Sequence, residues 1–218
     1  EVPVRKRRSS AWSNITTGVT NPIFTHMVGY KNHYFGGCCA TVNNQSWYTI
    51  RWSSLENPEV WPEDNWVAIG FTDQMPITGM IPFQDSLLIF KSVYPKQEAV
   101  PQGSVYTGSM WKFTASQLNV SPDPVVERIN TPPGVSTNFK RSLVNWDGEI
   151  CFWNYDGLYS FNGQTVTNLS SKIQPTVDTF NMRLNNDPQG AWVNNCSTIF
   201  KNDLYTTVRE GRSEALTS

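Results

Sequence analysis

A short pattern of apolar and polar positions recurs four times along the chain. Each copy has an apolar or aromatic residue, a two-residue polar turn, and a run rich in apolar and aromatic residues. The copies lie at Tyr30–Phe35, Phe83–Phe90, Trp146–Trp153 and Phe200–Tyr205. Their turns begin at residues 31, 84, 147 and 201, so the spacings are 53, 63 and 54 residues. β-Hairpins with such a period predict a propeller-like array of blades, each of which needs neighbours to bury its apolar face.

The turn residues have the chemistry of tight hairpin connections. Asn32, Asn202 and the Asp147-Gly148 pair tolerate the positive φ angles that two-residue hairpins require. In the second copy, the run Leu87–Phe90 is apolar throughout, without the alternation of a half-exposed strand. It therefore predicts a strand that is buried on both faces.

Further elements follow from local pattern. Strands are predicted at Trp47–Trp52, near Val105-Tyr106 and near Met110–Phe113. Residues Ser142–Phe161 predict a three-stranded antiparallel meander, because turn pairs separate three short runs with apolar and aromatic residues. A short helix is predicted within Leu169–Asn185.

The predicted organisation is an arm followed by one β domain. Residues 1–22 contain the basic run Arg5–Arg8 and predict an arm that clasps an acidic surface or nucleic acid, or else a disordered or neighbour-docked tail. Residues 23–218 hold about three and a half blades, whereas a closed propeller needs at least four. The predicted fold class is all-β, a propeller-like array that is incomplete within this chain and is completed by another polypeptide or by further residues.

Composition supports this fold and narrows the function. Of 218 residues, 39% are hydrophobic, 16% are charged and 13% are aromatic, with nine Trp, which favours sheets with large side chains between them. The net charge of −1 gives the chain as a whole no attraction to nucleic acid or acidic membranes. No run of 18 apolar residues is present, so no membrane span is predicted. Four cysteines, at 38, 39, 151 and 196, do not suggest a disulfide framework and are expected to be small buried residues.

The sequence offers few candidates for catalysis or metal binding. His26 and His33 are seven residues apart across the first turn and could face each other, but no third ligand is spaced to join them. His33 with Cys38 or Cys39 is the one local thiol–imidazole combination.

Carboxylates lie mainly where turns are expected. Asp73, Asp85, Asp147 and Asp156 are in or near turns, where Asp usually bonds the local backbone instead of acting as half of a glycosidase pair. We therefore predict no catalytic, cofactor-binding or metal-binding residues, no cofactor and no enzymatic activity.

Carbohydrate binding is harder to set aside. Exposed Trp and Tyr side chains stack on sugars, and the chain has nine Trp and eight Tyr, although most would fill the space between blades. Asn-x-Ser/Thr triplets begin at Asn14, Asn44, Asn119, Asn168 and Asn195. In a secreted eukaryotic propeller, Asn44 or Asn168 would be expected to carry a glycan.

Several segments resemble a known family. Ile77–Lys91, which reads ITGMIPFQDSLLIFK, resembles β-propeller segments of bacteriophage tail and head-to-tail structural proteins, and so does Trp52–Trp61 upstream of it. Ser142–Gly163 and Leu169–Pro175 resemble the next blade of those proteins. Residues 24–205 carry the resemblance. It implies a virion component of the tail nozzle or connector kind, present as a ring of identical subunits.

The hypothesis drawn from the sequence is a non-enzymatic virion structural protein of a phage tail or connector. Its expected partners are copies of itself and other virion proteins, with no membrane, and DNA could pass through the ring lumen without sequence-specific binding. Residues 53–65 and the proline-rich stretch 95–140 are the expected contact regions. The alternative is a carbohydrate-binding or depolymerising phage tail protein.

Overall fold

The computed structural model describes most of the predicted β region. The described residues are 5–8, 11–14, 17–18, 24–40, 45–72, 75–92, 108–116, 118, 124–131, 140–154, 157–173 and 196–207. For residues 5–8, 11–14, 17–18, 38–40, 45–46, 92, 140 and 173 only the backbone is described. The chain divides into two compact units, and each is described by itself below. The first unit contains Glu1–Lys91 and Ser109–Asn130, and the second contains Ser92–Gly108 and Thr131–Ser218.

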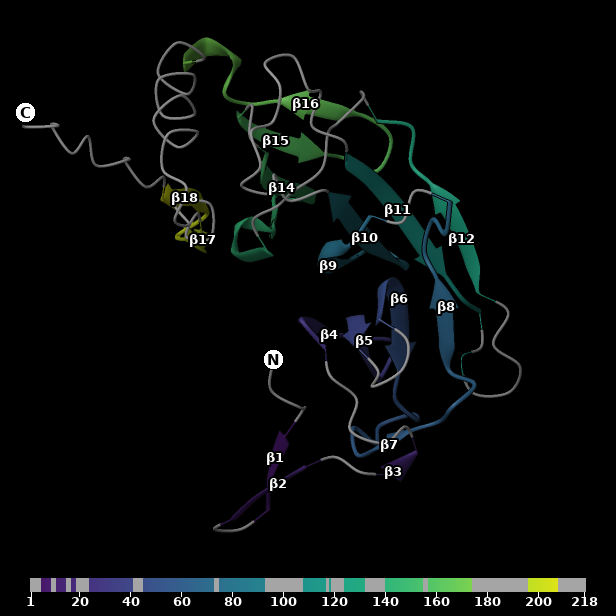
Figure 1. Cartoon of the computed structure of the whole chain (residues 1–218). Coiled ribbons are helices and arrows are strands. Elements are labelled where there is room, and N and C mark those ends of the chain that lie inside the picture. Colours follow the sequence, from purple (N-terminus) through teal and green to yellow (C-terminus); the bar gives the residue numbers. More distant parts are fainter. Residues whose placement is uncertain are drawn as a thin grey trace, which may run out of the picture. The chain divides into compact units, whose positions relative to one another are not determined.

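Among the described residues, the regular structure is almost entirely β (Figure 1). These residues form three sheets of four strands each and three of two. The helical elements among the described residues are two short 3-10 helices, η1 (Lys140–Ser142) and η2 (Ser171–Ile173). The all-β class predicted from the sequence is therefore confirmed.

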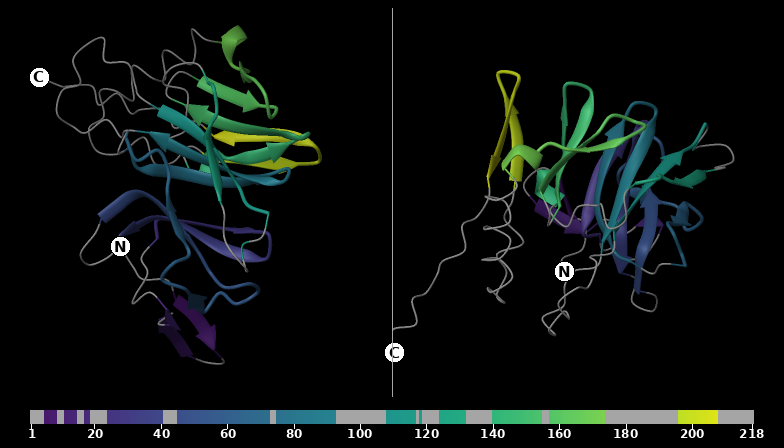
Figure 2. Two further views of the ribbon diagram at one scale, coloured as in Figure 1. Left: turned by 90° about the vertical axis from the view of Figure 1, so that its right-hand side faces the viewer. Right: turned by 90° about the horizontal axis from the view of Figure 1, so that it is seen from above.

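The first unit is built around two four-stranded sheets, each with its strands in chain order. The first sheet consists of β4 (His26–Tyr30), β5 (His33–Ala40), β6 (Gln45–Trp52) and β8 (Trp66–Ala68). The second sheet consists of β9 (Ile77–Phe83), β10 (Ser86–Ser92), β11 (Gly108–Thr114) and β12 (Val125–Arg128). Figures 1 and 2 show the two sheets side by side, with β9 against β4, β5 and β6.

An apolar core joins these two sheets because both present aromatic and branched side chains to each other. Phe113 on β11 is fully buried, and its ring centroid lies 5.4 Å from that of Phe35 and 5.9 Å from that of Trp52. Ile50 and Leu87 are also fully buried in this cluster. Large apolar side chains contribute about 1.5–3 kcal/mol each when fully buried, so this cluster dominates the stability of the first unit.

The basic N-terminal run forms a strand. Strand β1 (Arg5–Arg8) pairs antiparallel with β2 (Ala11–Asn14), with Arg5 opposite Asn14. The next strand, β3 (Thr17–Gly18), pairs in parallel with β7 (Val60–Trp61), within the predicted contact region 53–65. The backbone groups of these residues therefore have strand partners, and the arm or tail predicted over residues 1–22 stays a prediction. Whether the segment clasps a partner stays a prediction.

The described part of the second unit consists of one four-stranded sheet and one hairpin, besides the two 3-10 helices. The sheet consists of β13 (Val144–Trp146), β14 (Glu149–Asn154), β15 (Gly157–Phe161) and β16 (Val166–Asn168), paired antiparallel in that order. The hairpin consists of β17 (Cys196–Phe200) and β18 (Asp203–Thr207). The meander predicted in Ser142–Phe161 is confirmed, and β16 adds a strand to it.

All four predicted turns are two-residue hairpin connections. The residues flanking each turn pair with each other: Tyr30 with His33, Phe83 with Ser86, Trp146 with Glu149, and Phe200 with Asp203. Both turn residues have positive φ in the first, third and fourth copies, with values between 47° and 79°. Asn and Gly at these positions keep the strain low.

Other local predictions have mixed outcomes. Leu87–Phe90 is buried at every position, as the unbroken apolar run predicted. The strands at Trp47–Trp52 and Met110–Phe113 are confirmed within β6 and β11. Within the predicted helix Leu169–Asn185, η2 is the helical element among the described residues, and residues 174–185 lie outside them. The strand predicted near Val105-Tyr106 also lies outside the described residues.

Candidate functional site

Polar contacts at the edge of the core hold the first hairpin turn against the second. The Tyr30 hydroxyl donates to the Asp85 carbonyl oxygen at 2.7 Å. Lys31 Nζ lies 2.9 Å from Asp85 Oδ1 and donates to the Ala115 carbonyl oxygen at 3.0 Å. The same ammonium lies 5.5 Å from the centroid of the Tyr30 ring. Tyr30 and Lys31, at the turn of the first sheet, thus bind Asp85 in the turn of the second sheet.

Two pKa shifts follow from this geometry. Burial raises the pKa of Tyr30 above its ordinary value, because the phenolate would be poorly solvated beside the core. The hydrogen bond to Asp85 raises the pKa of Lys31, because the carboxylate stabilises the ammonium form. Both groups therefore hold their protons more tightly in the folded chain.

The second unit repeats this contact at the equivalent positions. Trp146 Nε1 donates to the Asn202 carbonyl oxygen at 2.9 Å. Tyr30 and Trp146 each come directly before a turn, and Asp85 and Asn202 are each the second residue of the next turn within the same unit. In both units, an aromatic donor at one hairpin thus binds the turn carbonyl of its neighbour.

A second indole reinforces the junction in the second unit. Trp153 Nε1 donates to Thr206 Oγ1 on β18. Trp153 is on β14 and is itself buried, whereas the hairpin that it binds is mostly exposed. Hydrogen bonds from two Trp side chains therefore anchor the β17–β18 hairpin to the third sheet.

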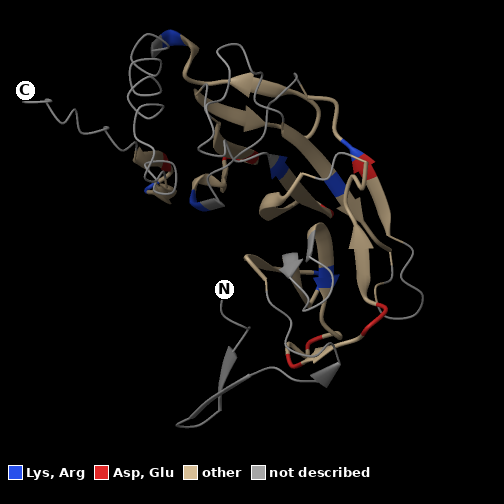
Figure 3. Cartoon of the chain, in the orientation of Figure 1, with Lys and Arg blue, Asp and Glu red and all other residues tan. Residues whose placement is uncertain are grey.

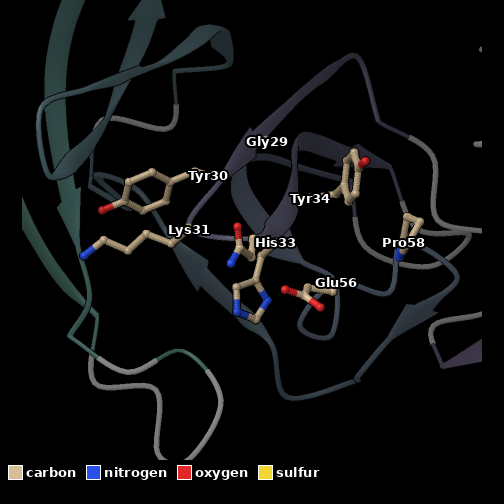
Figure 4. A pocket seen from close by; sticks show the side chains of 8 residues that line it. Gly29, Tyr30, Lys31, His33, Tyr34, Glu56 and Pro58 are labelled. Carbon is tan, nitrogen blue, oxygen red and sulfur yellow. The ribbon is translucent and has the colours of Figure 1, made fainter.

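An open pocket of about 520 Å³ lies beside the first turn. Its lining residues are Gly29, Tyr30, Lys31, Asn32, His33, Tyr34, Glu56 and Pro58. Figure 4 shows Tyr30 and Lys31 on one side of the turn, and Tyr34, Glu56 and Pro58 on the other. The Tyr34 side chain is 44% exposed, and Glu56 is exposed as well. The pocket thus presents an aromatic ring and a carboxylate to solvent, on the side away from the Asp85 contact.

The loop 53–65 is held against this turn by backbone contacts. Glu56 N donates to the Asn32 carbonyl oxygen at 2.7 Å, and Tyr34 N donates to Ser53 Oγ at 3.0 Å. Glu56 has a positive φ of 52°, and its backbone N–H is held against the turn by the bond to Asn32. The loop carries four acidic residues and no Lys or Arg, and Figure 3 shows acidic residues along this connection between β6 and β8. The region beside the pocket is therefore locally negative.

Close backbone packing shapes the outer face of the first sheet. A Cβ atom built on Gly36 would lie 2.4 Å from the Phe24 ring, so no larger residue fits there without displacing that ring. The Phe24 ring packs against Trp61, with centroids 4.6 Å apart. Gly36 therefore leaves room for the Phe24 ring, which in turn packs against Trp61.

The structure does not bring the predicted histidine pair together. His26 is opposite Gly37 and His33 is opposite Tyr30, so the two histidines lie at different ends of the β4–β5 ladder. His33 is buried, with Nδ1 2.7 Å from the Ser53 carbonyl oxygen, which is a packing role. Among the described residues, no group of three or more His, Cys, Asp or Glu could hold a metal ion.

The predicted thiols separate into two environments. Cys151 is buried and Cys196 is exposed, so the expectation of buried cysteines holds for the first and is wrong for the second. Burial, with a smaller contribution from Glu149, raises the pKa of Cys151 to about 11. Cys38 and Cys39 are in β5, but only their backbone is described, so the thiol–imidazole candidate with His33, which the sequence does not favour, is not tested.

Of the four predicted turn carboxylates, two are described. Asp85 and Asp147 are turn residues, as predicted, and Asp147 has a positive φ of 50°. Asp73 and Asp156 lie outside the described residues.

Of the five Asn-x-Ser/Thr triplets, one has a described asparagine side chain. Asn168 Oδ1 accepts hydrogen bonds from Ser170 N and Ser170 Oγ, at 2.8 and 2.9 Å. This Asn therefore stabilises the local turn. Asn14 is described by its backbone alone, and Asn44, Asn119 and Asn195 lie outside the described residues.

Sequence reasoning missed Lys91, although it named this residue within the family-like segment. Lys91 is fully buried, and its Nζ donates to the carbonyl oxygens of Ile69 and Gly70, at 2.6 and 3.0 Å. The ammonium also lies 5.9 Å from the ring centroids of both Tyr48 and Trp111. Its position directly after a fully buried apolar run was the available signal, because a strand buried on both faces does not become exposed within one residue.

Comparisons with known proteins identify no family for this chain. No protein-family model matches the chain, and no curated protein matches it. Within the described residues, no helix is long and apolar enough to cross a membrane.

Proposed function

We propose that this chain is a structural component of a bacteriophage virion, of the tail or head-to-tail connector kind, with sheets stacked as propeller-like blades. Its role is mechanical: rigid β blocks hold a fixed shape, and exposed turns and loops bind other virion subunits. The partners in this proposal are copies of the same chain and other virion proteins, with a lumen through which DNA passes.

The observation that carries this proposal is the repeated contact between successive hairpins. Three meanders each place their strands in chain order, and each begins with the same two-residue hairpin. In each unit, the residue before one turn donates to the carbonyl of the next turn. Sheets related in this regular way favour an array in which every blade covers the apolar face of its neighbour.

The described polar groups have structural roles that suit a building block. His33, Lys91 and Asp85 each bind backbone or a neighbouring sheet. The exposed acidic loop 53–65 supports the prediction that this region is a contact surface, since charges at an interface rim orient partners.

Imaging the purified chain tests the proposal directly. Electron cryomicroscopy with resolved symmetry is expected to show rings of identical subunits with blades around a common axis. A chain that remains monomeric at every concentration, or sheets that pack as one sandwich, would contradict the proposal.

A second candidate, carbohydrate binding, is favoured by the pocket beside the first turn. Tyr34 is an exposed aromatic ring on the same side of the pocket as the carboxylate of Glu56, an arrangement that could stack on and hydrogen-bond to a sugar. Glycan-array binding that is lost in Tyr34→Ala and retained in Trp66→Ala, another exposed aromatic on the same sheet, would support this candidate. Absence of binding by the wild-type chain would leave the structural role.

A further inference from the structure

The first and fourth turns have the same sequence pattern and the same geometry. Each has an aromatic residue followed by Lys-Asn: Tyr30-Lys31-Asn32 and Phe200-Lys201-Asn202. The φ angles are 47° and 60° in the first turn, and 49° and 70° in the fourth. Lys31 Nζ lies 5.5 Å from the preceding ring centroid, and Lys201 Nζ lies 5.4 Å from its own. The two lysines are therefore presented in the same way.

Their surroundings differ. Lys31 is bound by the Asp85 carboxylate and the Ala115 carbonyl oxygen of the neighbouring sheet. Lys201 is exposed, and no carboxylate in the described part of the chain pairs with it. The ring beneath Lys201 is also open: Phe200 is 58% exposed, whereas Tyr30 is 7% exposed. The fourth turn accepts the bond from Trp146, but among the described residues its own lysine and aromatic ring have no turn to bind.

The rest of the β17–β18 hairpin supports a docking role. Ile199 and Tyr205 are 39% and 51% exposed, and the Tyr205 ring lies beside that of Phe200, with centroids 6.3 Å apart. Figure 2 shows the hairpin (yellow) ending in its two-residue turn. An exposed apolar cluster rimmed by a Lys is typical of a protein–protein contact surface.

We propose that this turn docks into the pocket beside the first turn of a second copy of the chain. Lys201 of one copy pairs with the Glu56 carboxylate of the other, and the Phe200 ring packs against Tyr34 and Pro58. This inference rests on the proposed structural role, and it names the surfaces through which copies associate.

The pocket has the complementary chemistry for that turn. Glu56 is exposed, has no ion-pair partner among the described residues, and is held by its own N–H against the Asn32 carbonyl oxygen. Lys31 also lines the pocket but is paired with Asp85, whereas the loop 53–65 carries four acidic residues, so the loop side of the pocket attracts the cationic turn. Because Glu56 is already held beside the turn, little conformational freedom is lost when Lys201 binds.

The contact joins two different surfaces, so it is heterologous. Repetition of a heterologous contact closes into a ring or extends as a filament, according to the rotation between copies. This is the type of symmetry that an assembly of identical subunits in a tail or connector requires. The inference therefore links a single pair of turns to the form of the whole assembly.

Zero-length cross-linking of the wild-type chain provides the first test. A carbodiimide joins an amine to a carboxylate without a spacer, so an equal mixture of ¹⁴N- and ¹⁵N-labelled chain is cross-linked and analysed by mass spectrometry. The expected product is a Lys201–Glu56 peptide pair in which half of the molecules carry mixed labels. Pairs with unmixed labels alone would place the contact within one chain and overturn the inference.

Charge reversal provides the second test. We expect Lys201→Glu or Glu56→Lys to weaken self-association about tenfold or more in sedimentation velocity, and the two variants mixed together to recover it through the swapped pair. Lys172→Glu and Glu127→Lys, also at exposed positions, are the matched controls and are expected to associate like wild type. Circular dichroism of each variant verifies its folding.

The outcomes separate this inference from the proposed function. If wild-type copies assemble without the cross-link, and reversals match the controls, the docking surfaces are wrong while the structural role stands. If wild-type chain stays monomeric at all concentrations, both fail. A mixed-label cross-link with mutual recovery of the reversed variants supports both.

Discussion

The two units make the same turn-to-turn contact in opposite environments. In the first unit, Tyr30 is nearly buried, and its ring lies 5.6 Å from that of Phe35, within the core. In the second unit, the bond from Trp146 to Asn202 is exposed, and nearly every residue of β17 and β18 is exposed. The geometry of a hairpin contact therefore does not determine how much it stabilises the fold. Burial of the surrounding apolar area does.

The comparison also separates rigid from adaptable parts. In the first unit, the contacts of Tyr30 and Lys31 with Asp85 lie beside the buried apolar core, to which Tyr30 itself belongs. In the second, Trp146 and Trp153 donate hydrogen bonds to exposed partners on the hairpin. Contacts that compete with water contribute less to stability, so the β17–β18 hairpin is the element best suited to gain a further partner.

The largest effect is expected from a charge in the first unit's core. Leu88 is 1% exposed, so Leu88→Asp would bury an unpaired carboxylate, lower the free energy of unfolding by more than about 4 kcal/mol, and abolish assembly. Urea unfolding followed by Trp fluorescence measures this. Val125→Asp, at an exposed position in the same sheet, is the control. A Leu88→Asp variant that still assembled would contradict this account of the core.

Removing one Phe from each unit tests the comparison itself. Phe113 is fully buried, so Phe113→Ala is expected to cost about 3–5 kcal/mol. Phe200 is 58% exposed in the single chain, so Phe200→Ala is expected to leave the unfolding free energy of the monomer within about 0.5 kcal/mol of wild type. Denaturant midpoints of both variants provide the measurement. Similar losses for both in the dilute monomer would contradict the exposed position of Phe200 in the single chain.

A third pair of substitutions compares the buried Lys91 with the exposed Lys201. Lys91→Met removes the donor that binds the Ile69 and Gly70 carbonyl oxygens, and an expected loss of about 1–3 kcal/mol follows from leaving buried acceptors unpaired. Lys201→Met, at an exposed turn, is expected to leave the unfolding free energy of the monomer unchanged. Thermal unfolding of both variants decides the matter, and a Lys91→Met variant as stable as wild type would remove the structural role assigned to that ammonium.

The stability losses on removing the two aromatic donors, Tyr30 and Trp146, should differ less than those of the two lysines. Tyr30→Phe deletes a partly buried hydrogen bond and is expected to cost about 0.5–1.5 kcal/mol. Trp146→Phe removes an exposed bond, so its loss should lie at the lower end of the same range. If Trp146→Phe proved the more damaging change, the exposed junction would carry more stability than its solvent access suggests.

Alkaline pH provides the smallest test. The pKa values of Tyr30 and Lys31 are raised on folding, so the folded chain holds these protons more tightly than the unfolded chain. Their contribution is complete below the unfolded pKa values and is lost as pH rises through the folded values, above about pH 10. In Lys31→Met, stability should fall less steeply over this range than in Lys172→Met, a control at an exposed position. Identical slopes would argue against the Lys31 contribution.

Local predictions succeeded where the physical cause is local. The four turns follow from residues such as Asn32 and Gly148, whose backbones accept positive φ, and burial of Leu87–Phe90 follows from its unbroken apolar run. The charge of the basic run Arg5–Arg8 predicted an arm or a tail and gave no indication of the strand pairing with Ala11–Asn14. Charge pattern reports on solvation of side chains, and it does not report on whether a partner strand is near.

The sequence by itself determined the repeated hairpins, the all-β class and the positions of the turn carboxylates, because turn chemistry and strand periodicity act over a few residues. Only the tertiary structure decided that Tyr30 reaches Asp85, that Glu56 lies against the first turn, and that Lys91 is buried. These contacts join residues 21 to 55 positions apart. They depend on how sheets and loops pack, and no short stretch of sequence encodes that packing.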